Sequence, residues 1–204
     1  MVSEYVYSPH VDFFIDRVDR DSGYEMASFH IHHKYEIYYE IEGSRRYFIE
    51  DAAYIVNAGC VVLIGENQIH KTASLGDTAS SRIVVNFSRE YLDKIIDIFP
   101  EVDFFSFLSE EHNHLLSNIT VKQQNHIQGL LQQLPAQQEE TSPESDALRK
   151  MLLATLLLEL KDLCRQQQEQ GGENGRVSNH IVDQIQAYIA EHYADTDINI
   201  ASIA

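Results

Sequence analysis

Four side chains in the first half of the chain have the types and the spacing of a metal or polar-ligand site. His30 and His32 are followed by Glu36, and a third histidine, His70, comes later. Side chains two positions apart on an extended strand project from one face, so His30 and His32 can point to the same place. Imidazoles and a carboxylate suit a divalent ion such as Zn, Fe, Mn or Ni. The same groups would serve equally well to hydrogen-bond a polar ligand.

Short apolar segments of the first half predict the strands that would position these side chains. Each segment is rich in Tyr, Ile, Val and Phe and ends in turn residues. They are residues 36–43, 45–51, 52–59, 60–67 and 82–87. Their even spacing favours a sandwich or barrel of the jelly-roll kind. The N-terminal segment 1–18, with Phe13 and Phe14, is predicted to form the first strand rather than a lid over a ligand.

The apolar period becomes helical after Ser88. It predicts a helix that ends before Pro100, a second helix over 121–134 and a long third helix over 146–168. The third helix has an apolar face wider than one partner helix needs, which predicts that it also meets a second subunit. We therefore expect a homodimer in which the third helices of the two subunits pair. The contact would be made by Leu148, Met151, Leu152, Thr155, Leu156 and Glu159.

Composition limits the class of protein. A chain of 204 residues can form one well-cored domain and a smaller helical part. Its net charge of −17 argues against direct contact with a nucleic-acid backbone, which needs Lys and Arg. No membrane span or signal peptide is recognisable. The two cysteines, Cys60 and Cys164, form no metal or redox motif, which indicates a reducing, cytoplasmic setting.

The C-terminal part has a different character. Residues 170–178 are rich in Gln, Gly and Asn and predict a linker. Residues 179–204 predict one helix and the beginning of another. A helix that starts a few residues before a C-terminus cannot bury its apolar stripe, so we expect the chain to be a piece of a longer protein.

Two segments together resemble a known family. The run from Ser28 to Thr72, followed by RIVVNFS, is similar to the cupin-type sensor domain of AraC-family transcription regulators. The tail HIVDQIQAYIAEHYADTDINIASIA resembles the start of that family's double helix-turn-helix domain. The resemblance implies a mainly β fold with C-terminal helices, namely a cupin-like double-stranded β-helix (a jelly-roll barrel) and a helical dimerisation hairpin.

The resemblance also implies a division of the chain. Residues 1–169 would be the sensor domain, with the barrel at about 1–87 and the helices at about 88–169. Residues 170–178 would be the linker and 179–204 a truncated start of the helix-turn-helix domain. The recognition helices would lie beyond Ala204. Because residues 179–204 contain no Lys or Arg, we expect this part not to bind DNA.

The histidines can be compared with cupin motifs. His30-x-His32-x3-Glu36-x6-Gly43 resembles the first motif of metal-binding cupins in all its ligands. The second motif is poorer: Gly59 and His70 match, whereas Gly65, Asn67 and Ser74 replace its proline, second glycine and asparagine. Sensors of the AraC type often keep such a sequence without a metal. We therefore favour ligand contact or structural hydrogen bonding, expect no cofactor, and keep a divalent metal as the alternative.

Strand phase suggests the remaining ligand contacts. Tyr38 continues the phase of the inward-facing histidines. Only one of Arg45 and Arg46 can face the interior, and the spacing leaves the choice open; Arg46 is carried as the candidate. The ligand-binding set is then His30, His32, Glu36, Tyr38, Arg46 and His70. Tyrosine rings with a few polar groups suit a sugar or another polar metabolite, and equally they could only cap the core.

The resulting hypothesis is a non-enzymatic one. We expect the effector-sensing and dimerisation region of an AraC-type regulator, which binds a small polar molecule and contacts DNA only through the missing C-terminal part. The alternative is a metal-dependent cupin enzyme that uses His30, His32, Glu36 and His70. A barrel filled by its own side chains could not sense a ligand, so the size of the cavity should discriminate.

Overall fold

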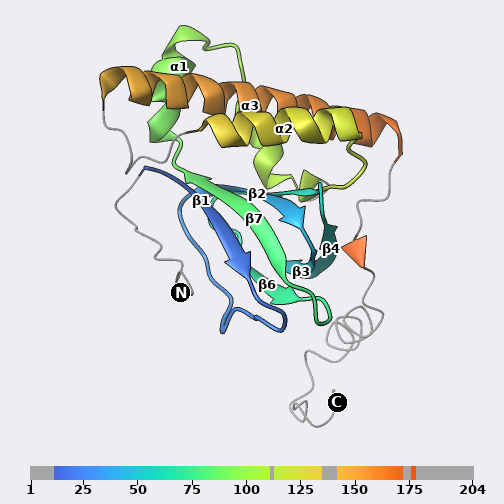
Figure 1. Ribbon diagram of the computed structural model, residues 1–204. Coiled ribbons are helices and arrows are strands. Elements are labelled where there is room, and N and C mark those ends of the chain that lie inside the picture. Colours follow the sequence, from blue (N-terminus) through green and yellow to red (C-terminus); the bar gives the residue numbers. More distant parts are fainter. Residues whose placement is uncertain (1–11, 111–112, 135–141, 172–175, 178–204) are drawn as a thin grey trace, which may run out of the picture.

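The computed structural model describes residues 12–110, 113–134, 142–171 and 176–177, which form two antiparallel sheets and a layer of helices (Figure 1). The first sheet has the strand order β1-β7-β2-β5-β8 and the second the order β6-β3-β4-β9. The strands are β1 (Phe13–Arg20), β2 (Tyr35–Glu42), β3 (Ser44–Ile49), β4 (Ala52–Asn57), β5 (Val61–Ile64), β6 (His70–Ser74), β7 (Ser80–Phe87), β8 (Leu115–Leu116) and β9 (Arg176–Val177). This confirms the predicted fold class, and the predicted jelly roll takes the form of two facing sheets.

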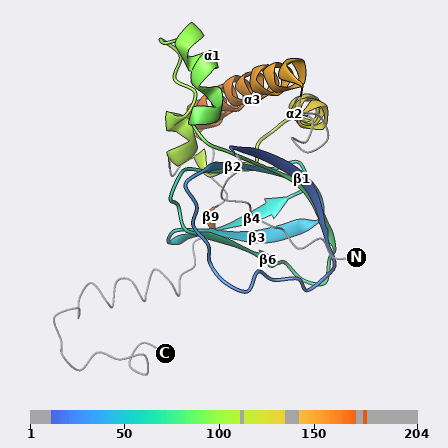
Figure 2. The same cartoon turned by 90° about the vertical axis from the view of Figure 1, so that its left-hand side faces the viewer.

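The first sheet is the middle of three layers, with the helices on one face and the second sheet on the other (Figure 2). Strand β2 shows why its sequence is almost wholly apolar or aromatic. Ile37 and Tyr39 belong to the core between this sheet and the helices, while Tyr38 belongs to the core between the two sheets. A strand covered on both faces loses the alternation of buried and exposed residues.

Two glycines shape the turns beside the site. Gly43 joins β2 to β3 with a φ of 89°, and a Cβ atom there would lie 2.3 Å from the carbonyl oxygen of Ala79. Gly59, expected to tolerate positive φ, has a φ of 86° just before β5. Only glycine adopts such a backbone without strain, so these turns set where β3 and β5 begin.

The helices follow the predicted order. They are the 3₁₀ turn η1 (Glu90–Leu92), α1 (Asp93–Ile98), the 3₁₀ turn η2 (Ser106–Ser109), α2 (Val121–Gln133) and α3 (Pro143–Glu169). Helix α3 starts three residues before the predicted Asp146. The Ser142 side chain caps the backbone N–H of Ser145, and Pro143 occupies the first turn, where a proline is well tolerated.

The predicted linker contains a short strand. Helix α3 ends at Glu169, and β9 pairs with β4 through Val177 opposite Ala53 and Arg176 opposite Tyr54. The predicted helix-turn-helix start, residues 179–204, lies outside the described residues, as does most of the N-terminal arm. Among the helices that the structure describes, none is long and apolar enough to cross a membrane.

Candidate functional site

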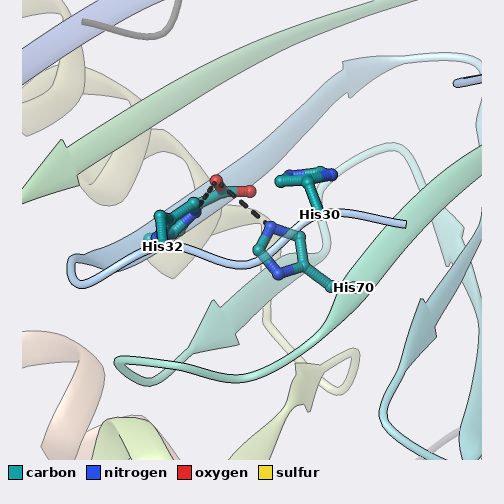
Figure 3. Close-up of side chains that lie close together, drawn as sticks. His30, His32 and His70 are labelled. Carbon is teal, nitrogen blue, oxygen red and sulfur yellow. Dashed lines mark hydrogen bonds and ion pairs between the residues drawn. The ribbon is translucent and has the colours of Figure 1, made fainter. Parts of the chain in front are cut away.

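The four residues singled out by their types come together between the two sheets. Glu36 is on β2 and His70 begins β6, while His30 and His32 lie in the segment before β2. His30 is held beside His70 by two backbone hydrogen bonds, each with an N–O distance of 3.0 Å. The potential ligand atoms of the four side chains lie within 4.8 Å of one another. Figure 3 shows the three imidazole rings turned toward one place.

Backbone carbonyls orient two of the rings. Nδ1 of His32 lies 2.9 Å from the carbonyl oxygen of Lys34, and Nδ1 of His70 lies 2.8 Å from that of Gln68. A carbonyl oxygen only accepts hydrogen bonds, so each Nδ1 must carry the hydrogen. In the neutral ring, Nε2 then carries a lone pair. Both Nε2 atoms therefore face inward as potential ligands. Metal-binding histidines are commonly oriented in this way, by a hydrogen bond from the other ring nitrogen to a carbonyl oxygen.

The Glu36 carboxylate meets these two nitrogen atoms. Its Oε2 lies 3.3 Å from Nε2 of His32 and 3.7 Å from Nε2 of His70, while Oε1 accepts a hydrogen bond of 2.7 Å from the Tyr47 hydroxyl. Lone pairs on two nitrogens and an oxygen would repel one another, so the cluster needs a cation. That cation is a proton on an imidazole or a metal ion.

The electrostatics fit a shared positive charge. Burial alone would raise the pKa of Glu36, but the imidazoles of His32 and His70 hold it well below its usual range. Burial likewise opposes charge on His70, but the Glu36 carboxylate beside it raises the pKa of this imidazole. Glu36 thus stays ionised, and its negative charge favours a proton on His70.

His30 differs from its neighbours. Burial, and then the nearby charge of His70, lower its pKa to about 4, so it is neutral near pH 7. Its ring centroid lies 3.9 Å from that of His70. Nδ1 of His30 and Nε2 of His70 are buried without a hydrogen-bond partner among the described residues. Unsatisfied buried nitrogens of this kind point to an occupant.

The residues present therefore fit a divalent metal. Three imidazole nitrogens and one carboxylate oxygen converge, and two of the rings are already oriented for coordination. Hydrogen bonding within the cluster, the other expectation, is seen as well, between His32, Glu36 and Tyr47.

A small cavity adjoins the cluster. It has a volume of about 40 Å³ and is lined in part by His30, Glu36 and Tyr38. This is little more than the roughly 30 Å³ that one water molecule occupies in the liquid, so a sugar does not fit there. A larger cleft of about 420 Å³ adjoins this inner cavity, because Arg20 and Tyr24 line both. Ser80 also lines this larger space, which we call the mouth cleft. The cleft falls within the size of small-molecule sites, about 300–1,000 Å³.

The structure corrects the prediction that Arg46 of β3 faces the interior. Arg46 is exposed, whereas Arg45 is fully buried between the sheets. Tyr38 faces the cavity as predicted, and its hydroxyl donates a hydrogen bond to Glu40. A β-bulge interrupts the pairing of β2 between Glu40 and Glu42, so simple alternation could not be carried through to β3.

The predicted dimer contacts are distributed around α3. Leu148, Met151 and Thr155 are exposed, and Leu152 is partly buried. Leu156 is completely buried in the core of its own chain, which excludes it from a subunit contact. Glu159 is exposed and lies 3.5 Å from His126 of α2. Leu158, which was not predicted, extends the exposed apolar stripe.

Known proteins share this architecture. A family model described as the AraC-like ligand binding domain matches residues 17–157. A search of the curated proteins finds no match. The crystal structure of an apo ToxT variant from Vibrio cholerae is similar with a TM-score of 0.52 and 14% identity, over 95% of this chain and 69% of that one. The cupin domain of Schizosaccharomyces pombe Cnp3 gives a TM-score of 0.38 and 11% identity, over 44% and 62%. A predicted oxalate decarboxylase from Thermotoga maritima gives 0.34 and 21%, over 36% and 64%.

Proposed function

Because this chain belongs to the family of AraC-like ligand-binding domains, we propose that it is the effector-sensing and dimerisation region of an AraC-type transcription regulator. Its effector is a small polar molecule that enters from the mouth cleft. The protein acts by binding and not by catalysis, and DNA is contacted through the helix-turn-helix domain that residues 179–204 resemble.

One observation carries this proposal. Buried nitrogen atoms that have no hydrogen-bond partner among the described residues, namely Nδ1 of His30 and Nε2 of His70, lie beside an inner cavity that shares two wall residues with a larger cleft. Each buried polar atom without a hydrogen bond reduces the stability of the fold by about 1–3 kcal/mol, and a ligand that pairs with such atoms recovers part of that loss. A sugar, the ligand class suggested by the tyrosines, would occupy the cleft, because the inner cavity is too small for it.

Coupling to the helices would run through the first sheet. Strand β2 presents Glu36 and Tyr38 to the ligand side and Ile37 and Tyr39 to the helices. A ligand that binds one arrangement of these strands better shifts the population toward it, and with it the packing of α3. The regulator would thereby present its DNA-binding domains differently.

We propose that the second subunit covers the exposed stripe of Leu148, Met151, Thr155 and Leu158 on α3. Three large apolar side chains on one exposed helix face are what a symmetric interface would bury. Leu152 lies at the edge of this stripe.

A second candidate function rests on the histidine cluster. A divalent metal held by His30, His32, Glu36 and His70 would act as the effector or as a structural ion. When bound, such an ion would supply Lewis acidity, which is the chemistry that the metal-dependent cupin enzyme would need. The convergence of the four potential ligand atoms favours this candidate.

A thermal-shift screen of the 204-residue chain tests both candidates. Sugars, organic acids and divalent metals are compared in a buffer that contains EDTA for the metal-free arms. A ligand at about 100 times its Kd adds about 2.7 kcal/mol of stability, which should raise the Tm by several degrees. Stabilisation by an organic compound supports effector sensing, and stabilisation by a metal alone supports the second candidate. No stabilisation by any compound would contradict both.

A further inference from the structure

A second polar cluster lies between the sheets, separate from the histidines. Arg45 on β3, Arg82 on β7 and Glu40 on β2 are all buried. Glu40 and Arg82 are paired residues in the ladder between β2 and β7, so their side chains emerge on the same face. The Tyr38 and Tyr47 rings, 5.1 Å apart, stand between this cluster and Glu36.

The two arginines are partnered differently. Arg45 donates from Nε to the Thr72 hydroxyl at 2.9 Å and from Nη2 to the carbonyl oxygen of Tyr24 at 2.8 Å. Cζ of Arg82 lies 5.5 Å from the centroid of the Tyr38 ring, and its Nη1 is buried with no hydrogen-bond partner among the described residues. Glu40 accepts from the Tyr38 hydroxyl through one oxygen, and its other oxygen has no partner in the described part of the chain.

Positive charge is in excess in this cluster. Two guanidinium groups face one carboxylate, and burial raises the pKa of Glu40 to about 7 even though Tyr38, Arg82 and Arg45 oppose that shift. Within the residues that the structure describes, neither arginine forms an ion pair of 4.0 Å or less with a carboxylate. Buried charges are normally paired, so this excess calls for an anion. The excess is notable in a chain whose net charge is −17.

An anion has a route to Arg82. Arg82 lines the inner cavity, which shares Arg20 and Tyr24 with the mouth cleft. Ser80 lies two residues from Arg82 on β7, hence on the same face of the strand, and lines the cleft. Its hydroxyl is buried and likewise has no hydrogen-bond partner among the residues that the structure describes. The Ser80 hydroxyl at the mouth cleft and the Arg82 guanidinium at the inner cavity therefore lie on one face of β7, and each offers a hydrogen-bond donor to a ligand.

We infer that the effector is a small organic acid whose carboxylate binds the Arg82 guanidinium and the Ser80 hydroxyl, with its remainder in the mouth cleft. Guanidinium groups bind carboxylates through charge-assisted and often bidentate hydrogen bonds. The cleft is also lined by Asp19, Asp21 and Glu42, which disfavour a second negative charge and favour an acid that carries hydroxyl or amino groups. This inference rests on the proposed effector-sensing function and specifies its ligand class.

The test compares acids with their amides, which lack the carboxylate. The probes are lactate, L-serine, lactamide, L-serinamide and inorganic phosphate, added to the 204-residue chain at equal ionic strength with chloride as the salt control. Saturable increases in Tm are expected with lactate or L-serine, and only the chloride-level response with the amides. Equal shifts from an acid and its amide, or no shift with either acid, would overturn the inference. So would a response to phosphate alone, because it would assign the site to a different oxyanion.

Variants then locate the site. Arg82→Gln should weaken acid binding about tenfold or more, since a charge-assisted hydrogen bond contributes about 1.5–3 kcal/mol. Arg17→Gln is the matched control, because Arg17 is an exposed arginine on the neighbouring strand β1. Ser80→Ala, which removes one donor and little volume, gives an independent reading if Arg82→Gln does not fold. Equal acid binding by the wild-type chain, the control and both site variants would overturn the inference. A response to neutral sugars only would overturn it too, but would leave the effector-sensing proposal intact.

Discussion

The charge on Glu36 should matter only while a cation lies between it and the imidazoles. In Glu36→Gln, the amide oxygen can still accept from Tyr47, and the amide N–H can donate to the lone pair of His32 or His70. The variant therefore keeps its hydrogen bonds but loses their charge-assisted part. Charged hydrogen bonds contribute about 1.5–3 kcal/mol and neutral ones about 0.5–1.5 kcal/mol, so the expected loss of stability is about 1–2 kcal/mol.

The loss should depend on pH in a defined direction. The lowered pKa of Glu36 gives stability that is present above the ordinary carboxyl pKa of 4.5 and is lost as the pH falls below it. The raised pKa of His70 gives stability that is present below 6.5 and is lost as the pH rises through the folded-state value. The advantage of the wild-type chain over Glu36→Gln should therefore be largest at about pH 5–6.5 and should shrink as the pH rises above 6.5.

Urea denaturation with EDTA at two pH values measures this difference. Glu101→Gln, at an exposed glutamate on the helical side of the molecule, is the matched control. In a parallel arm with Zn²⁺ or Mn²⁺ at about 100 times the wild-type Kd, the wild-type chain should gain about 2.7 kcal/mol if the cluster binds metal. A hundredfold loss of affinity in Glu36→Gln would reduce that gain to about 0.4 kcal/mol. The reasoning is refuted if Glu36→Gln and Glu101→Gln behave alike at both pH values and with metal.

Three further predictions concern other parts of the molecule. Glu40→Gln should match the wild-type chain at about pH 5 and be more stable at about pH 8, by at most about 3 kcal/mol in denaturant titrations. The reason is that the pKa of Glu40 is raised from 4.5 to about 7, so its ionisation destabilises the folded state. A difference in stability that stays constant across this pH range would contradict the prediction. Met151→Asp should convert a dimer into a monomer by light scattering while the control Gln132→Asp on α2 does not, and a wild-type monomer at micromolar concentration would refute the proposed interface. Asp103→Asn should destabilise the chain by about 1 kcal/mol near pH 7, since Asp103 accepts from the backbone N–H groups of Phe105 and Ser106 and binds Lys161 of α3 at 3.0 Å. Burial alone would raise the pKa of Asp103, but these hydrogen bonds lower it, so the difference should shrink as the pH falls below 3.8; an unchanged difference at low pH would show that the carboxylate charge is not involved.

The strands could be predicted from sequence because their patterns are local. The segments predicted from their apolar runs appear as β2, β3, β4, β5 and β7. The convergence of the histidines also followed from residue spacing together with the likeness to a cupin motif. Strand phase across a hairpin is less local, because Gly43 and the nearby β-bulge decide which arginine turns inward. Residue spacing alone therefore could not show that Arg45, and not Arg46, is the arginine buried between the sheets.

The remaining differences come from contacts that sequence spacing does not contain. Helix α3 is apolar on several faces, so its pattern could not separate Leu156, buried in its own core, from Met151, exposed to solvent. Arg82 meets Glu40 only because β7 lies next to β2 in the sheet. The sequence offered one signal, an arginine at the first position of the mainly apolar predicted strand 82–87, and this signal is informative only once the strand order is known.

Hydrogen–deuterium exchange with the compound that most stabilises the chain tests most directly whether the space between the sheets is the effector site. Amides of β2, β6 and β7 surround that space, and α3 packs on the other face of the first sheet. Binding there should slow exchange in these strands and change it in α3, and Arg82→Gln or Glu36→Gln should reduce both effects at a fixed, sub-saturating ligand concentration. Protection confined to other parts of the molecule, or unaltered in both variants, would contradict an effector site between the sheets.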